Sequence, residues 1–346
     1  MKQFGHGGLE PVNLRCLPPC CRPAHSLLLL VVAGFILQFA GIAQVSNLYS
    51  TGFEFAEGFD SQFTLIGQDN WTGTDSSGNG IVTNFFVNGV GGQPFGEQQA
   101  FVGFYPLTNT DGTLNVWRPL NFDAVASGLP VVTFSVTMSI YDSFAVTNRD
   151  CFRWSIYNTN NGGARLFTLD FDNTTTRVNY ELDDNQFVWT GYTFDNAAET
   201  NGQYDLAVTM NFADNLWSAW LNDVSIVDSK PITTKSSALN LGDIDAVWVN
   251  DMLGKPGDNF MVFDNYTVTA QPYPFRLDTL GRLGNGTFLL RLNGEPSRQY
   301  AIEVSEDFAS WSPLKTNNAA TDGTFDFADT TASNYNKSFY RARLVQ

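Results

Sequence analysis

Apolar and polar residues alternate along most of the chain after residue 43, which is the period of a β-strand with one buried face. In VVTFSVTMSIY, residues 131–141, every second residue from Val132 to Ile140 is apolar, and the residues between them are Thr or Ser. LAVTMNF, residues 206–212, has the same period and is followed by LWSAWL and VSIV, with Asn- and Asp-containing turns between them. This pattern predicts antiparallel strands that form a three-strand meander.

Aromatic strand-like segments separated by Gly, Asn and Asp indicate an all-β protein, because helical periodicity is hard to find after residue 43. The span 44–271 is longer than an immunoglobulin-type module, so we expect an antiparallel jelly-roll β-sandwich there. In QPYPFRLD, residues 271–278, two prolines interrupt strand pairing and predict a linker. Residues 272–346 contain FLLRL, YAIEVS, FDFAD and FYRARL, which predict a second, smaller β-sandwich domain.

The smaller domain needs a core of its own, and aromatic residues would supply most of it. Tyr300, Ile302 and Val304 alternate along one strand and would face inward. We expect this core to be closed by Trp311 and by aromatic residues of FDFAD and FYRARL, since each buried ring removes a large area from water.

The first 43 residues have the pattern of a secretory signal peptide. Lys2, Arg15 and Arg22 precede the apolar run LLLLVVAGFILQFAGIA, which ends in small residues, so we expect cleavage before Gln44. An uncleaved anchor is the alternative, but the run is shorter than the about 20 residues that span a bilayer. The expected location is therefore secreted or at the cell surface, with no membrane span in the mature chain.

The composition of residues 44–346 excludes several kinds of chemistry. This part of the chain has no His and only one Cys, Cys151, which excludes His-dependent nucleophilic catalysis, His-based zinc sites and an internal disulfide. It carries 16 Lys and Arg against 34 Asp and Glu, so nucleic acid is not an expected partner. Abundant carboxylates instead suit solubility or a hard cation such as calcium.

Five segments together resemble the concanavalin A-like lectin/glucanase superfamily, a LamG-like jelly-roll group, over about residues 50–270. They are GFEFAEGFD, GQDNW, GNGIV, NLWSAWLNDVSIV and DNFMVFDNYTV. The resemblance implies a sandwich that binds carbohydrate. The segments YAIEVSEDFASWSPL, GTFDFAD and FYRARL resemble a small β-sandwich domain found at the C-termini of secreted bacterial proteins, which implies an accessory or surface-display role.

The same resemblance implies a structural calcium ion. Related jelly rolls share a calcium between an acidic residue near the end of the first strand and another on the last strand. The corresponding residues here are Glu54 or Glu57 and Asp264. Carboxylate oxygens on adjoining strand ends suit calcium. The alternative is that Asp264 lies on a solvated face or caps a turn with Asp258.

Glucanases of this superfamily carry two catalytic carboxylates on one strand in the pattern E-x-D-x-E. The segment ELDD begins with Glu181 and Asp183 but continues with Asn185 and Gln186, so the second glutamate is absent. Retaining hydrolysis needs two carboxyl groups about 5–5.5 Å apart. We therefore predict no catalytic residues in ELDD, while carboxylate pairs from different strands remain open.

Carbohydrate binding would use exposed aromatic rings beside carboxylates and amides, and DDNQFVWTGYTFDN, residues 183–196, offers this combination. The candidate binding residues are Trp189, Tyr192, Asp183 and Asn185. A packed β-hairpin accounts for the same residues. The sequence thus predicts a secreted or cell-surface, non-catalytic protein that binds glycan. The alternatives are a glycoside hydrolase or polysaccharide lyase on the same fold, and a structural or adhesive cell-envelope protein.

Overall fold

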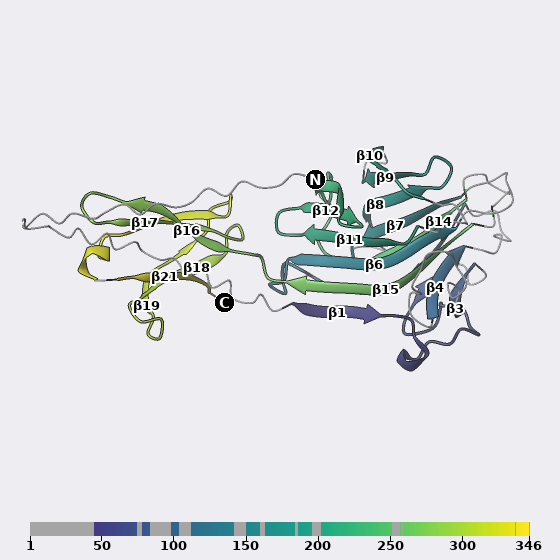
Figure 1. Cartoon of the computed structure of the whole chain (residues 1–346), viewed down its shortest axis with the longest axis horizontal. Coiled ribbons are helices and arrows are strands. Elements are labelled where there is room, and N and C mark those ends of the chain that lie inside the picture. Colours follow the sequence, from purple (N-terminus) through teal and green to yellow (C-terminus); the bar gives the residue numbers. More distant parts are fainter. Residues whose placement is uncertain are drawn as a thin grey trace, which may run out of the picture.

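The computed structural model describes residues 45–74, 78–83, 98–103, 112–141, 150–159, 163–183, 186–195, 202–250, 257, 259–335 and 337–345. These residues form antiparallel β-strands joined by turns, with two short 3-10 segments, η1 (Phe55–Glu57) and η2 (Ala332–Asn334). Figure 1 shows a larger β unit built from β1–β15 and a smaller one built from β16–β21, joined where β15 leads into β16. The predicted all-β antiparallel sandwich is confirmed.

The larger unit consists of two stacked sheets. Its strands are β1 (Ser46–Thr51), β2 (Thr72–Gly73), β3 (Asn79–Thr83), β4 (Gln98–Gly103), β5 (Thr113–Trp117), β6 (Val131–Tyr141), β7 (Cys151–Tyr157), β8 (Arg165–Asp172), β9 (Arg177–Leu182), β10 (Phe187–Thr193), β11 (Tyr204–Asn211), β12 (Leu216–Leu221), β13 (Val224–Pro231), β14 (Asp243–Val249) and β15 (Phe260–Gln271). One sheet has eight strands in the order β13-β12-β11-β6-β15-β4-β3, and β1 also pairs with β15. The other has seven, in the order β10-β9-β8-β7-β14-β5-β2.

The core lies between the two sheets. Trp217 of β12 stacks on Phe167 of β8 with ring centres 3.9 Å apart, and Trp154 of β7 lies 5.1 Å from Phe134 of β6. All four rings are almost fully buried. The predicted inward face of β6, from Val132 to Ile140, is buried as expected, because its alternation matches the pleat of a strand with one face on the core.

The smaller unit contains β16 (Arg276–Arg282), β17 (Phe288–Asn293), β18 (Gln299–Ser305), β19 (Ser312–Asn318), β20 (Thr324–Asp329) and β21 (Phe339–Leu344). They form two three-stranded sheets, β16-β17-β20 and β19-β18-β21. A separate buried cluster lies between them and includes Tyr300, Ile302, Val304, Phe325 and Tyr340. Only residues 272–275 separate β15 from β16, so the Pro-rich break is shorter than the predicted linker.

Trp311 does not close this second core, and that prediction is wrong. The guanidinium carbon of Arg341 lies 4.2 Å from the Trp311 ring centre, and Arg341 pairs with Glu303 on the outer side of β18. Trp311 lies just before β19, where the turn that follows β18 carries it to the outside.

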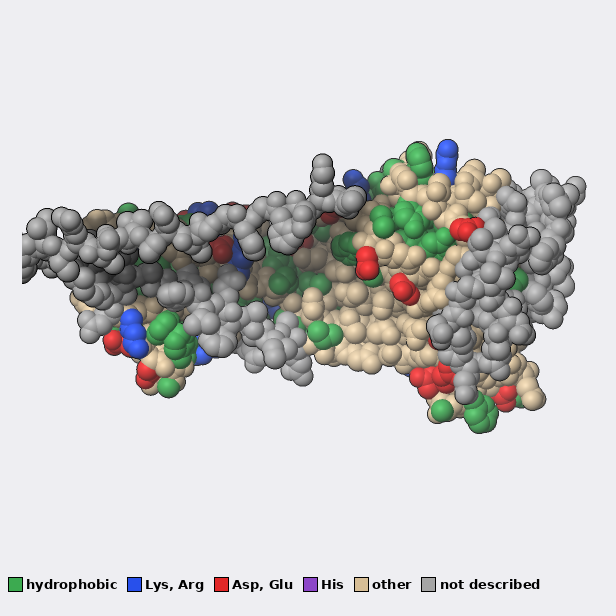
Figure 2. Space-filling view, viewed as in Figure 1, with side chains coloured by type: hydrophobic (Ala, Val, Ile, Leu, Met, Phe, Trp, Pro, Cys, Tyr) green, Lys and Arg blue, Asp and Glu red, His purple; other side chains and the backbone are tan. Residues whose placement is uncertain are grey.

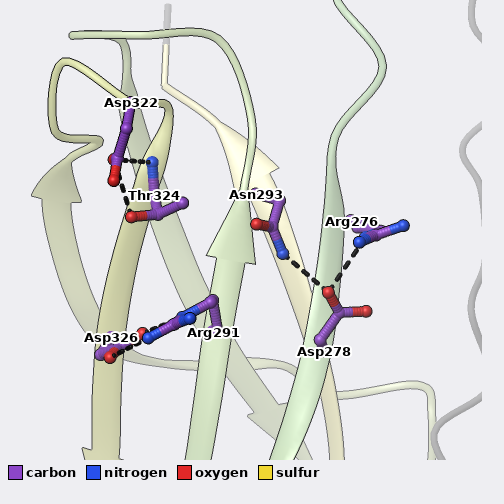
Figure 3. Close-up of polar contacts among 7 residues, drawn as sticks. All are labelled: Arg276, Asp278, Arg291, Asn293, Asp322, Thr324 and Asp326. Carbon is purple, nitrogen blue, oxygen red and sulfur yellow. Dashed lines mark hydrogen bonds and ion pairs between the residues drawn. The ribbon is translucent and has the colours of Figure 1, made fainter.

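The outer face of β16-β17-β20 carries polar pairs within and between its strands (Figure 3). Arg291 of β17 donates two hydrogen bonds to Asp326 of β20, at 2.6 and 2.7 Å. Asp278 of β16 accepts from Arg276 and from Asn293. These pairs hold charges on a solvated face, while the other face of the same sheet supplies apolar side chains to the core.

No helix among the described residues is long or apolar enough to span a membrane. The predicted signal peptide, residues 1–43, lies outside the described residues. The predicted boundaries 44–271 and 272–346 remain predictions, which fragment experiments can test.

Candidate functional site

The seven-stranded sheet has a polar outer face, opposite its face on the core. On this side most of the alternating residues of β7, β8 and β9, and the first two of β14, are polar, while the residues between them are apolar or aromatic and mostly buried. We call this surface the outer polar face and define it by Arg153, Ser155, Tyr157, Arg165, Thr168, Asp170, Arg177, Asn179, Glu181, Asp243 and Asp245, with Phe187 and Trp189 of β10 at its edge.

Strand register arranges these side chains in rows that cross the sheet. One row runs Phe187, Glu181, Thr168, Ser155 and Asp245, each opposite the next on a neighbouring strand. The adjacent row runs Trp189, Asn179, Asp170 and Arg153. Side chains opposite one another in such rows are within contact distance, so the face is a continuous surface from β10 to β14.

Two arginines of this face are held by buried carboxylates. Arg153 Nε donates to Asp170 Oδ1 at 2.7 Å, and Arg165 Nη2 donates to Glu181 Oε1 at 2.8 Å. The carboxylate side chains are each 5% exposed, whereas the Arg153 and Arg165 side chains are 20% and 25% exposed. Burial raises the pKa of Asp170, although its hydrogen bonds with Arg153 and Asn179 oppose the rise. The cations therefore form the outer layer and the acids lie beneath them.

The aromatic edge of the face is solvent-exposed. Phe187 and Trp189 are 47% and 51% exposed and lie on the same side of β10, which is an edge strand. The Arg153 guanidinium carbon lies 5.0 Å from the Phe187 ring centre, and that of Arg177 lies 4.9 Å from the Trp189 ring centre. Figure 2 shows hydrophobic side chains beside a basic one where β9 and β10 lie. Each ring is thus in cation–π contact with an arginine.

At the β14 end the face is acidic. Asp243 and Asp245 lie two residues apart on the same side of β14, and Asn115 Nδ2 donates to Asp245 Oδ2 at 2.7 Å. The pKa of Asp245 is raised by burial and then by the charge of Asp243, and burial also raises the pKa of Asp243. One buried oxygen of Asp245 and one of Glu181 have no hydrogen-bond partner among the described residues. Buried carboxylate oxygens are normally paired, so each of these two oxygens is an exception on the face.

Three of the four predicted binding residues lie among the described residues, and they have different environments. Trp189 is exposed on the outer polar face, as the binding hypothesis requires. Tyr192 packs partly against the main core, beyond a bulge at Gly191, whose φ is +89°. Trp189 Nε1 donates to the Tyr192 backbone carbonyl at 3.2 Å, so the two residues touch although their side chains have different environments. Asn185 lies outside the described residues.

Asp183 anchors a turn. Its carboxylate accepts hydrogen bonds from the Thr233 and Thr234 hydroxyls and from the backbone N–H groups of Thr234 and Lys235, the latter two at 3.0 Å. Burial raises the pKa of Asp183, but the hydrogen bonds from Thr233 and Thr234 outweigh it and hold the pKa below the usual value. Asp183 therefore joins the end of β9 to the segment after β13.

The acidic residues predicted to bind calcium lie near the junction of β1 and β15. Asp264 is 1% exposed, so the alternative of a solvated position is wrong, and Asp258 lies outside the described residues. Burial raises the pKa of Asp264 to about 7; an N–H bond from Asn265 opposes this, and the charges of Glu54 and Glu57 add to it. Figure 2 shows acidic side chains gathered at the projecting η1 turn.

The Glu57 carboxylate already accepts three hydrogen bonds. Its Oε2 atom accepts from the Thr51 hydroxyl at 2.8 Å and from the backbone N–H groups of Gly52 and Glu54 at 2.9 and 3.1 Å. No group of three or more His, Cys, Asp or Glu side chains among the described residues is placed to hold a metal ion. The Glu54 side chain in turn accepts a hydrogen bond from the Glu57 backbone N–H, so side-chain movement would be needed for Glu54, Glu57 and Asp264 to assemble a site.

Sequence reasoning missed most of the outer polar face. It noted Glu181 only as part of ELDD and did not consider Arg153, Arg177, Asp170 or Phe187. The available pattern was the alternation of polar residues in CFRWSIY, RLFTLDF and RVNYEL, which places one polar residue per pleat on one side of three consecutive strands. Their pairing order was the missing information.

No family model matches the chain, and no curated protein matches it. Among solved structures, the metal-free carbohydrate recognition domain of Emp46p is 13% identical with a TM-score of 0.41, covering 65% of this chain and 97% of that one. A sialidase is 9% identical with a TM-score of 0.39; the match covers 57% of this chain and only 17% of the sialidase. A GH131 β-glucanase catalytic domain from Podospora anserina is 12% identical with a TM-score of 0.33, covering 49% and 71%. At these low scores and identities, the similarities assign neither a ligand nor an activity to this chain.

Proposed function

We propose that the chain is a non-catalytic carbohydrate-binding protein that acts outside the cell or at its surface, and that it binds glycan at the β9–β10 end of the outer polar face. One observation carries this proposal: Phe187 and Trp189 present exposed rings on one side of an edge strand, directly beside a row of polar side chains. An exposed aromatic pair is costly in water and is typical of a surface that meets a ligand.

The chemistry of the site suits a sugar. The apolar face of a sugar ring can pack against Trp189, while amide and guanidinium N–H groups donate to its hydroxyl oxygens. Asn179 lies opposite Trp189 on β9, and Arg177 lies against the Trp189 ring. The site therefore combines one stacking surface with at least two hydrogen-bonding side chains.

The placement of the carboxylates favours binding over hydrolysis. Three strand spacings separate Glu181 from Asp245, about 14 Å, which exceeds the about 5–9.5 Å required of a glycosidase pair. Asp170 and Glu181 lie closer together, but both are buried and paired with arginines. A catalytic acid must reach the glycosidic oxygen, which these groups do not do as placed.

A glycan array probed with residues 44–346 tests the proposal. We expect the wild type to bind at least one glycan, Trp189→Ala to lose that binding, and Trp220→Ala to retain it. Trp220 is a matched control because it is a half-buried tryptophan on β12, in the other sheet. Equal binding by all three proteins would contradict the site, and the absence of any bound glycan would favour a structural or adhesive role. Release of reducing ends from a polysaccharide would favour the hydrolase alternative.

A structural calcium ion is a second, separate proposal. It is supported by the burial of Asp264 next to the charges of Glu54 and Glu57, an arrangement that a cation would neutralise. The ion would hold the end of β1 against β15. It has no role in the glycan site, because β1 and β15 belong to the other sheet.

A further inference from the structure

The outer layer of the glycan site is cationic, although the chain as a whole is strongly acidic. Residues 44–271 contain eight Lys and Arg against 26 Asp and Glu. Three of those eight cations, Arg153, Arg165 and Arg177, lie together on β7, β8 and β9. Arg153 and Arg165 are paired with Asp170 and Glu181, which lie beneath them, so the groups that solvent meets at this end of the face are mainly guanidinium groups.

We propose that the ligand is an anionic glycan, whose carboxylate or sulfate groups are bound by these arginines at the β8–β10 end of the outer polar face. The proposal rests on the proposed function and names the substrate class for that site. Guanidinium groups bind carboxylate and sulfate oxygens through paired N–H donors, which a neutral sugar does not exploit as fully.

The layering of charge supports this inference. The carboxylates of Asp170 and Glu181 are 5% exposed, so a ligand meets the more exposed guanidinium groups of Arg153 and Arg165 first. A guanidinium group has five N–H donors, and the contact of Arg153 with Asp170 is made through Nε. Asp170 therefore orients Arg153 from below and leaves the other N–H donors of Arg153 for an anion above.

Arg177 is the strongest candidate for direct contact. It is exposed, lies against Trp189, and makes no ion pair with a carboxylate among the described residues. Its cross-strand neighbour Asp172 is instead bonded to Thr174 and Thr175 in the next turn. An anion bound by Arg177 would lie beside the Trp189 ring. Adjacent side chains would then bind the anionic group and stack against the sugar ring of the same ligand.

The decisive experiment compares matched polymers that differ in charge. Binding of residues 44–346 is measured by calorimetry with dextran sulfate and dextran, and with polygalacturonate and its methyl ester. We expect one charged polymer to bind at least about tenfold more tightly than its neutral counterpart, with weaker binding at higher salt. The pair that shows the difference distinguishes sulfate from carboxylate.

Variants locate the effect. Arg177→Gln should weaken binding of the charged polymer at least about tenfold, because a charge-assisted hydrogen bond is lost, and Arg177→Lys should restore part of it. Arg341→Gln removes the same charge from the Arg341–Trp311 contact of β21, outside the site, and should leave the affinity unchanged.

Three results would overturn the inference: equal affinity for charged and neutral polymers, no effect of Arg177→Gln, or an equal loss in Arg341→Gln. Binding to neutral glycans alone would contradict the inference of an anionic ligand but would still support the proposed glycan-binding function. Failure to bind any glycan, charged or neutral, would instead remove the proposed function itself.

Discussion

The Arg153 guanidinium carbon lies 5.0 Å from the centre of the Phe187 ring, although β8 and β9 separate their strands. The two side chains therefore extend toward each other across the sheet. Arg153 also donates to Asp170 of β8, so a connected series of contacts leads from the exposed edge of the sheet to a buried carboxylate. Through its contact with Arg153, Phe187 thus links the edge strand β10 to the central strand β7. This role is separate from any contact that Phe187 makes with a ligand.

This relationship predicts a stability effect that a purely exposed ring would not have. Phe187→Ala should lower the free energy of unfolding by about 1–2 kcal/mol, because it removes a cation–π contact and part of the apolar cover of the face. Val188→Ala is the matched control, since Val188 is 42% exposed on the opposite side of the same strand. Urea unfolding measures both. Equal and small losses in the two variants would show that the Arg153–Phe187 contact contributes no stability.

Asp183 gives a second prediction, in which a residue chosen from sequence as a ligand contact acts in folding. Asp183→Ala should lower the free energy of unfolding by about 2–4 kcal/mol, because the turn at 233–235 loses the charged acceptor that its buried Thr233 hydroxyl and two part-buried N–H groups share. Glycan binding at Trp189 should persist in the folded fraction. A loss of glycan binding at unchanged stability would instead show that Asp183 acts in ligand binding, as the sequence predicted.

The same residue predicts a dependence on acid. Because the pKa of Asp183 is lowered in the folded protein, its contribution is present above the unfolded value of about 4 and is lost as the pH falls through the folded pKa. Asp183→Asn should therefore reduce stability at neutral pH. On acidification, this variant should lose less stability than the wild type loses. Thermal unfolding between pH 7 and pH 3 measures this, and parallel curves for the two proteins would contradict it.

Local pattern was sufficient to predict the strands, because a strand with one face on the core imposes a two-residue period. β6 and β11 were found in this way, with Val132 to Ile140 and Leu206 to Met210 buried as expected. The Pro-rich break before β16 was also visible, since proline cannot donate to a ladder. These are properties of single segments and require no knowledge of which strands become neighbours.

The candidate site could not be found in the same way, because it depends on the order of strands. Glu181, Thr168 and Ser155 form one row only because β9, β8 and β7 pair in a fixed register. Trp189 and Tyr192, three residues apart, were grouped by proximity in sequence, but the bulge at Gly191 separates their environments. The prediction for Trp311 was wrong for a related reason. Its hydrophobicity suggested a place in the second core, but a turn places it outside that core.

The buried residues of the larger and smaller units form separate clusters, which predicts two units of unfolding. The cluster around Tyr300 and Ile302 is distinct from the main core, and Tyr273 donates to Asp214 at 2.7 Å next to the short connection. We expect fragments 44–271 and 272–346 each to unfold cooperatively, the smaller with the lower Tm because small cores bury less area. Calorimetry of both fragments and of residues 44–346 tests this. A smaller fragment that is unfolded by circular dichroism would show that its fold depends on the larger unit.

Asp264 provides the last prediction, which links pH and calcium. Its folded pKa of about 7 lies above the unfolded value of about 4, so the folded protein retains a proton that the unfolded chain releases. The contribution of Asp264 is thus fully present below about pH 4 and is lost as the pH rises through about 7. Asp264→Asn should remove this part of the pH dependence of Tm, measured in chelator.

Calcium should reverse the loss, because it binds the deprotonated carboxylate and only the folded state assembles the ligands. The rise in Tm on adding millimolar calcium should therefore be larger at pH 8 than at pH 5, and Glu54→Gln should reduce it. Glu303→Gln is the control, since Glu303 is a buried, arginine-paired carboxylate in the smaller unit. An identical Tm with calcium and with chelator at pH 8 would exclude the ion, and Asp264 would then be a buried acid that weakens the fold as the pH rises.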